Sequence, residues 1–425
     1  MKSLLVKINS KLNAQGGFLK AVSVLVGGTA FAQLVGLICL PILTRLYSPE
    51  DYAVLGIYVA IVSILSVIAC LRLEIAIPIP EKDAEAKSLL ILSLLSNFFI
   101  VSILYLILFF LNPILQNFYI IQKLDIWVWF IPLGVFLSGL YSALQYWSTR
   151  RKRFKDIAQT RMTQAICNNG ASLSVGFLTG GFWGLILGQL FSFGGGLLKL
   201  GYSTYKDTIY VKKNTSLKTV LYKYQDFPKY STFEALANTS AIQLPLIIIA
   251  SFLVGPEVGY LMLAMKVLGI PMGLIGSAMS QVYLSHAPTY YQKGELYRYT
   301  QSILNKILKL VILPFLLLLL ISPYIFGFIF GKQWGDIGYY ISAMVPWYFM
   351  QILSSPVSMS LHIIGKQKVA LILQLIGFLI RVIFLIGIAV LSHKWIIPYY
   401  MISGFLFYTI YMSTILAYLK YTGEK

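Results

Sequence analysis

The sequence has 425 residues, of which 58% are apolar and only 12% are charged, and its mean hydropathy is +0.77. These values lie outside the range of soluble globular domains, so we expect a polytopic membrane protein. The net charge of +19 does not indicate nucleic-acid binding, because the cations stand between apolar runs rather than on one face of a soluble domain. The sequence has no Walker loop or Gly-rich nucleotide motif, which disfavours an ATP-driven pump.

Apolar stretches long enough to cross the hydrocarbon core of a membrane recur along the whole chain. They predict an all-α protein with twelve transmembrane helices, near residues 21–44, 52–72, 88–111, 126–148, 157–179, 182–205, 231–254, 258–285, 303–328, 336–361, 368–391 and 395–419.

The lysines and arginines predict the orientation of these spans. Most of the 34 cations fall in the N-terminal arm and in alternate connections, where Arg150–Arg153 form a dense cluster. Only Arg45, Lys123, Lys332 and Lys394 fall in the connections on the other side. Because positive residues favour the cytoplasmic side, we expect both termini in the cytoplasm. The Arg150–Arg153 cluster is explained by topology and by contact with anionic lipid.

A short sequence pattern that occurs twice indicates that the chain consists of two halves. Ser48-Pro49-Glu50 precedes the second span, and Gly255-Pro256-Glu257 precedes the eighth. Each has the order of a cap residue, a proline at the first helical position and an acid at the positive end of the helix dipole. Six spans plus six in the same orientation predict two lobes, residues 1–205 and 231–425, around a central cavity.

The connection between these halves, residues 206–230, is the longest on the predicted cytoplasmic side. Leu217, Val220, Leu221 and Tyr224 recur at helical spacing, with lysines on the opposite face. The pattern predicts an amphipathic linker helix that lies on the anionic membrane surface.

Lys266 and Arg381 each lie midway along an apolar span. A cation at the centre of a bilayer costs roughly 2.5 to 3.5 kcal/mol on insertion scales, so it usually faces a protein interior or an aqueous cavity. We interpret both residues as ligands for an anionic substrate. The alternatives are a Lys266 side chain that snorkels to an interface and an Arg381 that pairs with a group on another helix.

Polar and small residues share a helical face with each cation. Gly273, Ser277 and Gln281 follow Lys266, and Gln374 and Gly377 precede Arg381. Asn238 belongs to a less specific polar face on the seventh span, which interhelical hydrogen bonds explain equally well. The three cysteines and three histidines lack metal-ligand spacing, so we expect no metal, disulfide or cofactor.

Several segments resemble one known family. They are Pro41–Tyr52, Leu71–Pro78, Asp226–Ser231 followed by Gln243–Pro245, and Gly255–Glu257 through Lys266 to Ile275–Gln281. These segments are similar to those of the bacterial oligosaccharide flippases of polysaccharide biosynthesis, in the multidrug/oligosaccharidyl-lipid/polysaccharide (MOP) exporter superfamily.

The resemblance implies a MATE-like fold that moves an undecaprenyl-pyrophosphate-linked oligosaccharide, an O-antigen or capsule-type repeat unit, across the bacterial inner membrane. It also implies coupling to H⁺ or Na⁺, and contact with membrane lipids and other polysaccharide-assembly proteins. Pyrophosphate binding requires cations, and sugars suit amide and aromatic side chains. The substrate-binding candidates, including two arginines within the resembling segments, are Lys266, Arg381, Gln281, Gln374, Asn238, Arg45 and Arg72.

Two other functions are open at this point. A MATE-type drug or cation antiporter would carry carboxylates at the centre of its spans, whereas Glu234 lies close to a span end. A membrane polysaccharide polymerase would carry a large external loop, whereas the outer connections are short. The sequence departs from the peptidoglycan-precursor branch of the superfamily, which has arginines in its first span, because here that span offers Gln33 and no charge between Lys20 and Arg45. The resemblance therefore implies a surface-polysaccharide flippase rather than a lipid II flippase.

Overall fold

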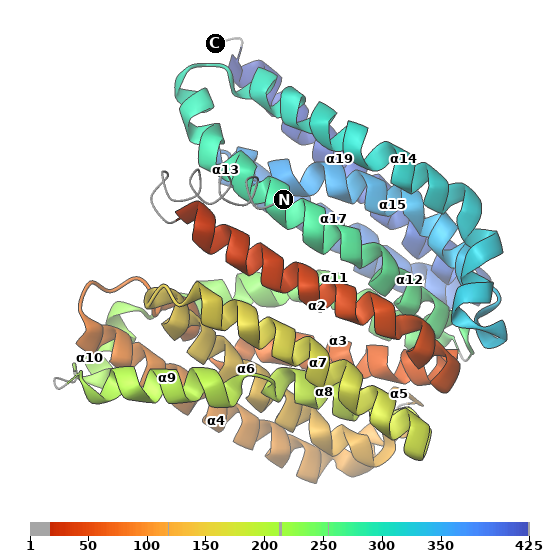
Figure 1. The fold of residues 1–425 in the computed structure, drawn as a ribbon, viewed down its shortest axis with the longest axis horizontal. Coiled ribbons are helices and arrows are strands. Elements are labelled where there is room, and N and C mark those ends of the chain that lie inside the picture. The colour runs from red at the N-terminus through yellow and green to blue at the C-terminus, as the bar shows by residue number, and fades with distance from the viewer. Residues whose placement is uncertain (1–17, 118, 212–214, 254, 424–425) are drawn as a thin grey trace, which may run out of the picture. The chain divides into compact units, whose positions relative to one another are not determined.

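A computed structural model describes residues 18–117, 119–211, 215–253 and 255–423. All regular structure within these ranges is helical, as the sequence predicted (Figure 1). The chain forms two compact units. Unit 1 comprises the described residues up to Leu46 and Tyr58–Ser240, and unit 2 comprises Tyr47–Ile57 and the described residues from Ala241 onward.

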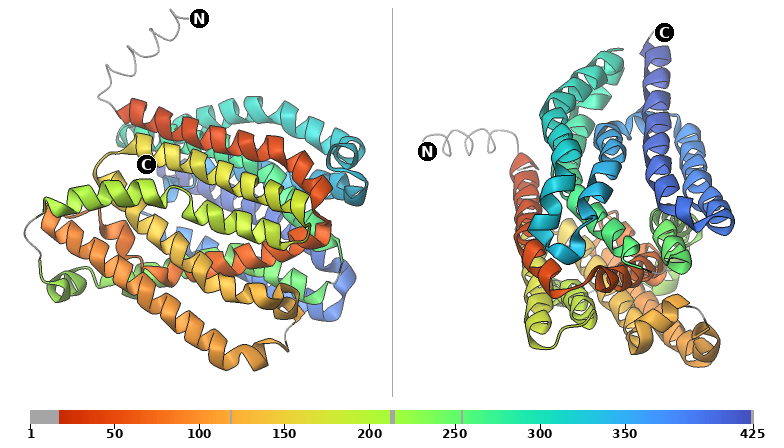
Figure 2. Two further views of the ribbon diagram at one scale, coloured as in Figure 1. Left: turned by 60° about the horizontal axis from the view of Figure 1, so that its bottom comes forward. Right: turned by 90° about the vertical axis from the view of Figure 1, so that its right-hand side faces the viewer.

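Unit 1 is built around α7, which packs against both α2 and α8. Figure 2 shows α7 and the α8–α9 pair side by side. The helices of this unit are α2 (Phe18–Leu46), the part of α3 (Pro49–Ala69) from Tyr58 onward, α4 (Asp83–Leu115), α5 (Tyr119–Leu124), α6 (Phe130–Arg150), α7 (Phe154–Leu178), α8 (Trp183–Gly194), α9 (Leu197–Ile209) and α10 (Leu217–Lys223), with short turns η1 (Leu73–Ala76) and η2 (Asp125–Trp129).

Unit 2 is built around α15, which contacts α12, α14 and α19. Its helices are α12 (Glu257–Pro271), α13 (Ser277–Gln292), α14 (Leu296–Phe330), α15 (Ile337–Val357), α16 (Ser360–Ile363), α17 (Gln367–Phe378), α18 (Phe384–Leu391) and α19 (Ile396–Gly423), with turns η4 (Met272–Gly276), η5 (Lys332–Trp334), η6 (Leu379–Ile383) and η7 (His393–Trp395). The units divide within two helices: α3, whose residues up to Ile57 belong to unit 2, and α11 (Thr232–Phe252), which follows η3 (Phe227–Ser231).

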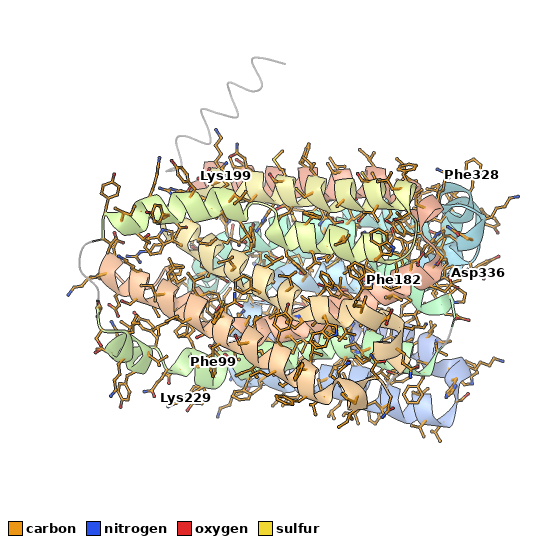
Figure 3. All side chains as sticks on the ribbon, turned by 90° about the horizontal axis from the view of Figure 1, so that it is seen from below. Phe99, Phe182, Lys199, Lys229, Phe328 and Asp336 are labelled. Carbon is orange, nitrogen blue, oxygen red and sulfur yellow. The ribbon has the colours of Figure 1, made fainter. Side chains whose placement is uncertain are left out.

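The predicted spans coincide with long helical segments. Among the described residues, ten of these segments are long and apolar enough to cross a membrane. The segments α7 and α15 are not among the ten, because α7 carries several polar residues and α15 is rich in tyrosine, serine and proline. Large apolar side chains such as Phe99 on α4 and Phe328 on α14 are exposed (Figure 3). The protein is therefore a multi-pass membrane protein, as predicted.

The two similar segments that precede the second and eighth spans, residues 48–50 and 255–257, differ in how they cap the helix that follows. Pro49 is the first residue of α3, and Ser48 and Asp51 form reciprocal bonds: the amide of Ser48 donates to Asp51 Oδ2 (2.8 Å), and the amide of Asp51 donates to Ser48 Oγ (3.2 Å). The second segment lacks these capping bonds, because the N-cap residue of α12 is Pro256, which makes no side-chain capping bond. The predicted order of a cap residue followed by a proline at the first helical position thus holds only for residues 48–50.

The linker helix departs from the prediction. α9 continues to Ile209, beyond the predicted boundary at residue 205, and residues 212–214 of the linker lie outside the described ranges. α10 follows, and its Val220, together with Tyr224, packs in a buried core of unit 1 with Leu73 and Trp147. Val220 and Tyr224 of the predicted apolar face are therefore covered by protein from η1, α4 and α6, whereas Leu217 and Leu221 of the same face are exposed.

The Arg150–Arg153 cluster also makes more specific contacts than the sequence predicted. Arg150 Nη2 lies 2.9 Å from Asp83 Oδ1, and Arg153 Nη2 lies 2.7 Å from Asp207 Oδ1. Arg150 Nη1 also donates to the carbonyl oxygen of Pro80. The cluster therefore joins α6 to the α3–α4 connection and to α9, a role that lipid contact alone does not explain.

Candidate substrate-binding site

Lys266 lies on α12 and is exposed. Its Nζ lies 5.7 Å from the centre of the Tyr52 ring, a cation–π distance. Tyr52 is only 1% exposed and packs edge-on against Trp334, with ring centroids 5.2 Å apart. The cation of Lys266 therefore lies beside a buried edge-to-face pair of aromatic rings in unit 2.

Local packing fixes the position of α12 in this unit. A Cβ at Gly259 would lie 1.9 Å from the carbonyl oxygen of Pro49, so only glycine allows α12 to approach the start of α3 this closely. This contact brings Lys266 to Tyr52, which lies one turn after Pro49.

Arg381 lies in η6, a π-helical turn between α17 and α18, and is 6% exposed. Its guanidinium carbon lies 4.7 Å from the centre of the Trp347 ring and 5.5 Å from those of Phe407 and Tyr408. Rings from α15 and α19 therefore surround the cation. We call these three residues with Arg381 the aromatic cage. Single π-helical turns inside α-helices are frequent at functional sites.

Two buried donors in the cage are unsatisfied. Arg381 Nε and Trp347 Nε1 have no hydrogen-bond partner among the described residues. A buried donor without a partner costs about 1 to 3 kcal/mol, and cationic and indole N–H groups both prefer an acceptor such as a phosphate or carboxylate oxygen. The cage therefore has the donor chemistry of an anion site.

Both cations have a connection to α15. Tyr348, next to Trp347 in the chain, donates a long hydrogen bond of 3.5 Å to the carbonyl oxygen of Met265. Met265 directly precedes Lys266, so this turn of α15 contacts α12 beside Lys266. The same turn carries Trp347, whose ring contacts Arg381. In unit 2 the same segment of α15 thus bonds to α12 beside Lys266 and carries the ring that contacts the Arg381 side chain.

The other candidates in unit 2 are less constrained. Gln374 is exposed on α17, and Gln281 lies on α13, where its side chain is outside the described part.

The remaining candidates, Asn238, Arg45 and Arg72, belong to unit 1. Asn238 and Arg45 are exposed, on α11 and at the end of α2. Arg72 has a left-handed backbone (φ 57°), and its Nη1 lies 3.8 Å from Glu74 Oε1. Burial raises the pKa of the Glu74 carboxyl, and the Arg72 charge opposes that rise. Arg72 is therefore already engaged with a buried acid.

Sequence reasoning missed the cage residues Trp347, Phe407 and Tyr408. The only signal was the aromatic content of 15%, which does not single out positions. Residues on α15, η6 and α19 meet only through tertiary packing.

The fold is that of MOP superfamily transporters. An inward-facing multidrug resistance MATE family transporter matches 94% of this chain over 95% of its own, at 13% identity and a TM-score of 0.66. An outward-facing transporter of that family (12% identity, 96% and 97% covered, TM-score 0.61) and a MOP superfamily transporter from Pyrococcus furiosus (12%, 95% and 96%, 0.61) also match.

Residues 42–338 match the family described as polysaccharide biosynthesis protein, and the chain belongs to this family. The resemblance drawn from the sequence is thereby confirmed. No curated protein matches the sequence. At these low identities the structural matches show the fold alone, whereas the family match extends over most of the chain.

Proposed function

We propose that the protein is a flippase that carries an undecaprenyl-pyrophosphate-linked oligosaccharide across the bacterial inner membrane by alternating access coupled to H⁺ or Na⁺. The family and the transporter fold support this class. The observation that carries the substrate proposal is Lys266, an exposed cation in the middle of an apolar helical span. Such a cation is costly in lipid and is suited to a pyrophosphate.

Each candidate residue then has a proposed role. Lys266 contacts the pyrophosphate, and Arg381 with Trp347 Nε1 provides the second set of donors once the cage rings admit the phosphate. The amides of Gln281, Gln374 and Asn238 hold the sugars. Arg45 and Arg72 meet the headgroup in unit 1, which for Arg72 requires release from Glu74.

The test is complementation of surface polysaccharide in a strain that lacks the gene, with membrane abundance measured alongside. A charge-assisted hydrogen bond contributes about 1.5 to 3 kcal/mol, so losing one should weaken binding by roughly tenfold to over a hundredfold. Lys266→Arg should retain more transport than Lys266→Gln, and Arg381→Lys more than Arg381→Gln.

The matched control is Lys420→Gln, which removes an exposed cation in the last turn of α19. It should support transport like the wild type. Wild-type transport by the Lys266→Gln, Arg381→Gln double variant would eliminate the cationic mechanism. In the deletion strain itself, lipid-linked oligosaccharide should accumulate on the cytoplasmic leaflet.

The proposed orientation has a separate test. Cysteines placed at Ser48, Lys123, Gly255 and Lys332 should react with an impermeant reagent from the periplasm, and one placed at Lys229 should not. Labelling of position 229 from the periplasm would reverse the orientation.

The competing proposal is a MATE-type drug or cation antiporter, and two of the fold matches are multidrug resistance MATE family transporters by name. A buried arginine disfavours an organic cation in unit 2. Drug resistance conferred by overexpression, together with normal surface polysaccharide in the deletion strain, would support that alternative.

A further inference from the structure

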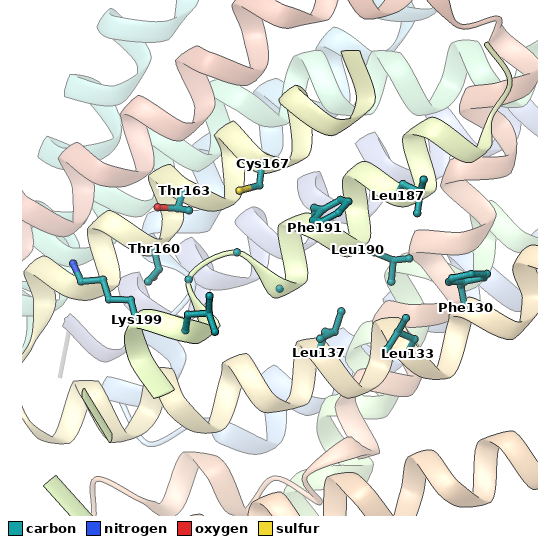
Figure 4. A pocket seen from close by; sticks show the side chains of 14 residues that line it. Phe130, Leu133, Leu137, Thr160, Thr163, Cys167, Leu187, Leu190, Phe191 and Lys199 are labelled. Atoms are coloured by element: carbon teal, nitrogen blue, oxygen red, sulfur yellow. The ribbon is translucent and has the colours of Figure 1, made fainter. Parts of the chain in front are cut away.

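The sixth predicted span is broken within unit 1. α8 ends at Gly194 and α9 begins at Leu197, with Gly196 at φ +91°, a left-handed conformation that favours glycine. Beside this break lies a cavity of about 660 Å³, enclosed by α6, α7, α8 and α9 (Figure 4). The broken helix therefore creates space that a continuous helix would fill.

The walls of the cavity are almost entirely apolar. Leu133 and Leu137 from α6 face Leu190 and Phe191 from α8, and polar side chains gather at the end formed by Thr160, Thr163 and Lys199 (Figure 4). Phe191 and Leu198 at the rim are 57% and 92% exposed. Exposed apolar side chains on a membrane span face lipid, so this cavity opens toward hydrocarbon rather than toward water.

Aromatic residues locate the membrane interface at the polar end. Tyr202 and Tyr205 are exposed on α9, and Lys206 Nζ lies 4.6 Å from the centre of the Tyr202 ring. Exposed tyrosines and lysines of this kind are typical of the headgroup level. Lys199 precedes Tyr202 by one turn, a rise of about 4.5 Å, so its side chain reaches the interface by snorkelling.

The dimensions fit a single lipid chain. At about 1.5 Å per residue, α8 from Leu187 to Gly194 accounts for about 10.5 Å, and the break and the start of α9 extend the lining to Lys199, so its length is comparable with the roughly 15 Å of hydrocarbon in one leaflet. Lys199 Nζ lies 3.2 Å from Asp156 Oδ1 and also bonds Gln159. Its charge is therefore partly balanced. Lys206, two turns further along α9, supplies a second cation, and its Nζ lies over the ring of Tyr202, which stands between the two lysines in the chain.

We propose that this cavity binds one acyl chain of an anionic phospholipid, with the phosphate at Lys199 and Lys206. The site is separate from the proposed pyrophosphate ligands of unit 2 and does not depend on the identity of the transported substrate. It gives the N-terminal unit a structural lipid that fills the break between α8 and α9.

Gly194 offers a direct test, because a Cβ there would meet no heavy atom within 4 Å, and the residue lines the cavity. Gly194→Leu should place an apolar side chain in the cavity, with its Cβ in open space. Native mass spectrometry of protein from nanodiscs of phosphatidylglycerol and phosphatidylcholine should show phosphatidylglycerol retained by the wild type. The Gly194→Leu variant should retain about tenfold less, the equivalent of excluding two methylene groups from an apolar site.

The matched control is Gly170→Leu, the same change at an exposed position of α7 that also has open space. It should retain the lipid. Lys199→Gln should lower the preference for phosphatidylglycerol over phosphatidylcholine. Equal lipid retention by Gly194→Leu and Gly170→Leu would overturn the proposal.

Cys167 provides a measurement that needs no cavity-filling variant, because it lines the cavity and is partly exposed. In a protein with Cys39 and Cys70 replaced by serine, added phosphatidylglycerol should slow alkylation of Cys167 by N-ethylmaleimide in detergent. An unchanged rate would contradict the proposal. Protection by undecaprenyl pyrophosphate but not by phosphatidylglycerol would also overturn it, and would assign the cavity to the tail of a polyprenyl lipid.

Discussion

The guanidinium carbon of Arg381 lies 4.7 Å from the centre of the Trp347 ring, and both residues are at least nine-tenths buried. An arginine in this position is stabilised without a carboxylate, because the ring face attracts the cation, by about 2 kcal/mol when the pair is desolvated. The Nε atom of Arg381 and the Nε1 atom of Trp347 remain available as donors among the described residues. The ring thus holds the cation while leaving N–H groups for an anion.

The first prediction separates these two roles of Trp347. Trp347→Phe keeps a ring and removes the indole donor, so it should weaken substrate binding by about tenfold with little loss of protein from the membrane. Trp347→Leu removes the aromatic face as well and should lower both transport and thermal stability. The exposed Trp395 serves as control, and Trp395→Phe should change neither quantity. Full transport by Trp347→Phe would show that the indole N–H does not contact the substrate.

The second prediction concerns pH and Glu74. Burial raises the pKa of this carboxyl in the folded state, so the folded protein binds the proton more tightly than the unfolded chain does. The stabilisation from this proton is complete below the unfolded pKa and is lost as pH rises through the folded pKa. Glu74→Gln should therefore gain stability relative to the wild type as pH increases above about 4.5.

Thermal unfolding in detergent from about pH 5 to about pH 8 measures this difference. The control is Glu81→Gln, because the Glu81 side chain is exposed. A Tm difference between Glu74→Gln and the wild type that is the same at every pH would refute the prediction.

The third prediction concerns Arg150, whose side chain is only 10% exposed. Its Nε and Nη2 both donate to Asp83 Oδ1, at 3.1 and 2.9 Å, and Nη2 also donates to the carbonyl oxygen of Glu81 at 3.1 Å. A lysine retains the charge but lacks the planar fork, so Arg150→Lys should lower the free energy of unfolding by about 1.5 to 3 kcal/mol. Lys155→Ala, an exposed change on the next helix, should leave it within about 0.5 kcal/mol. Chemical unfolding provides the measurement, and equal stability of Arg150→Lys and the wild type would restore the lipid-contact interpretation.

The fourth prediction concerns the attachment of α10 to unit 1. Val220 is 1% exposed within the core that contains Leu73 and Trp147, so Val220→Ala should destabilise the linker by about 1 to 3 kcal/mol. Lys218→Ala, on the exposed side, should be dispensable. Hydrogen exchange of residues 217–224 should speed up in the first variant only. Equal exchange in both variants would favour a linker that rests on the membrane.

The sequence by itself determined the helical fold, the positions of the long helices and the polysaccharide family. The helices follow from the length and continuity of apolar runs, which are local properties of the chain. An apolar run of sufficient length is stable as a helix across the hydrocarbon core of a membrane. The sequence also singled out Lys266 and Arg381, because an ionised side chain in an apolar run is conspicuous without any knowledge of its neighbours.

The tertiary structure alone decided which groups surround these residues. Trp347, Arg381 and Phe407 come from three separate helices, and the burial of Val220 depends on residues of η1, α4 and α6. Hydropathy is the same whether an apolar face contacts lipid or protein, so the sequence did not show that Val220 and Tyr224 pack in unit 1 while Leu217 and Leu221 stay exposed. The cavity beside Gly194 has the same origin, because the break between α8 and α9 becomes a site only where two other helices, α6 and α7, line it.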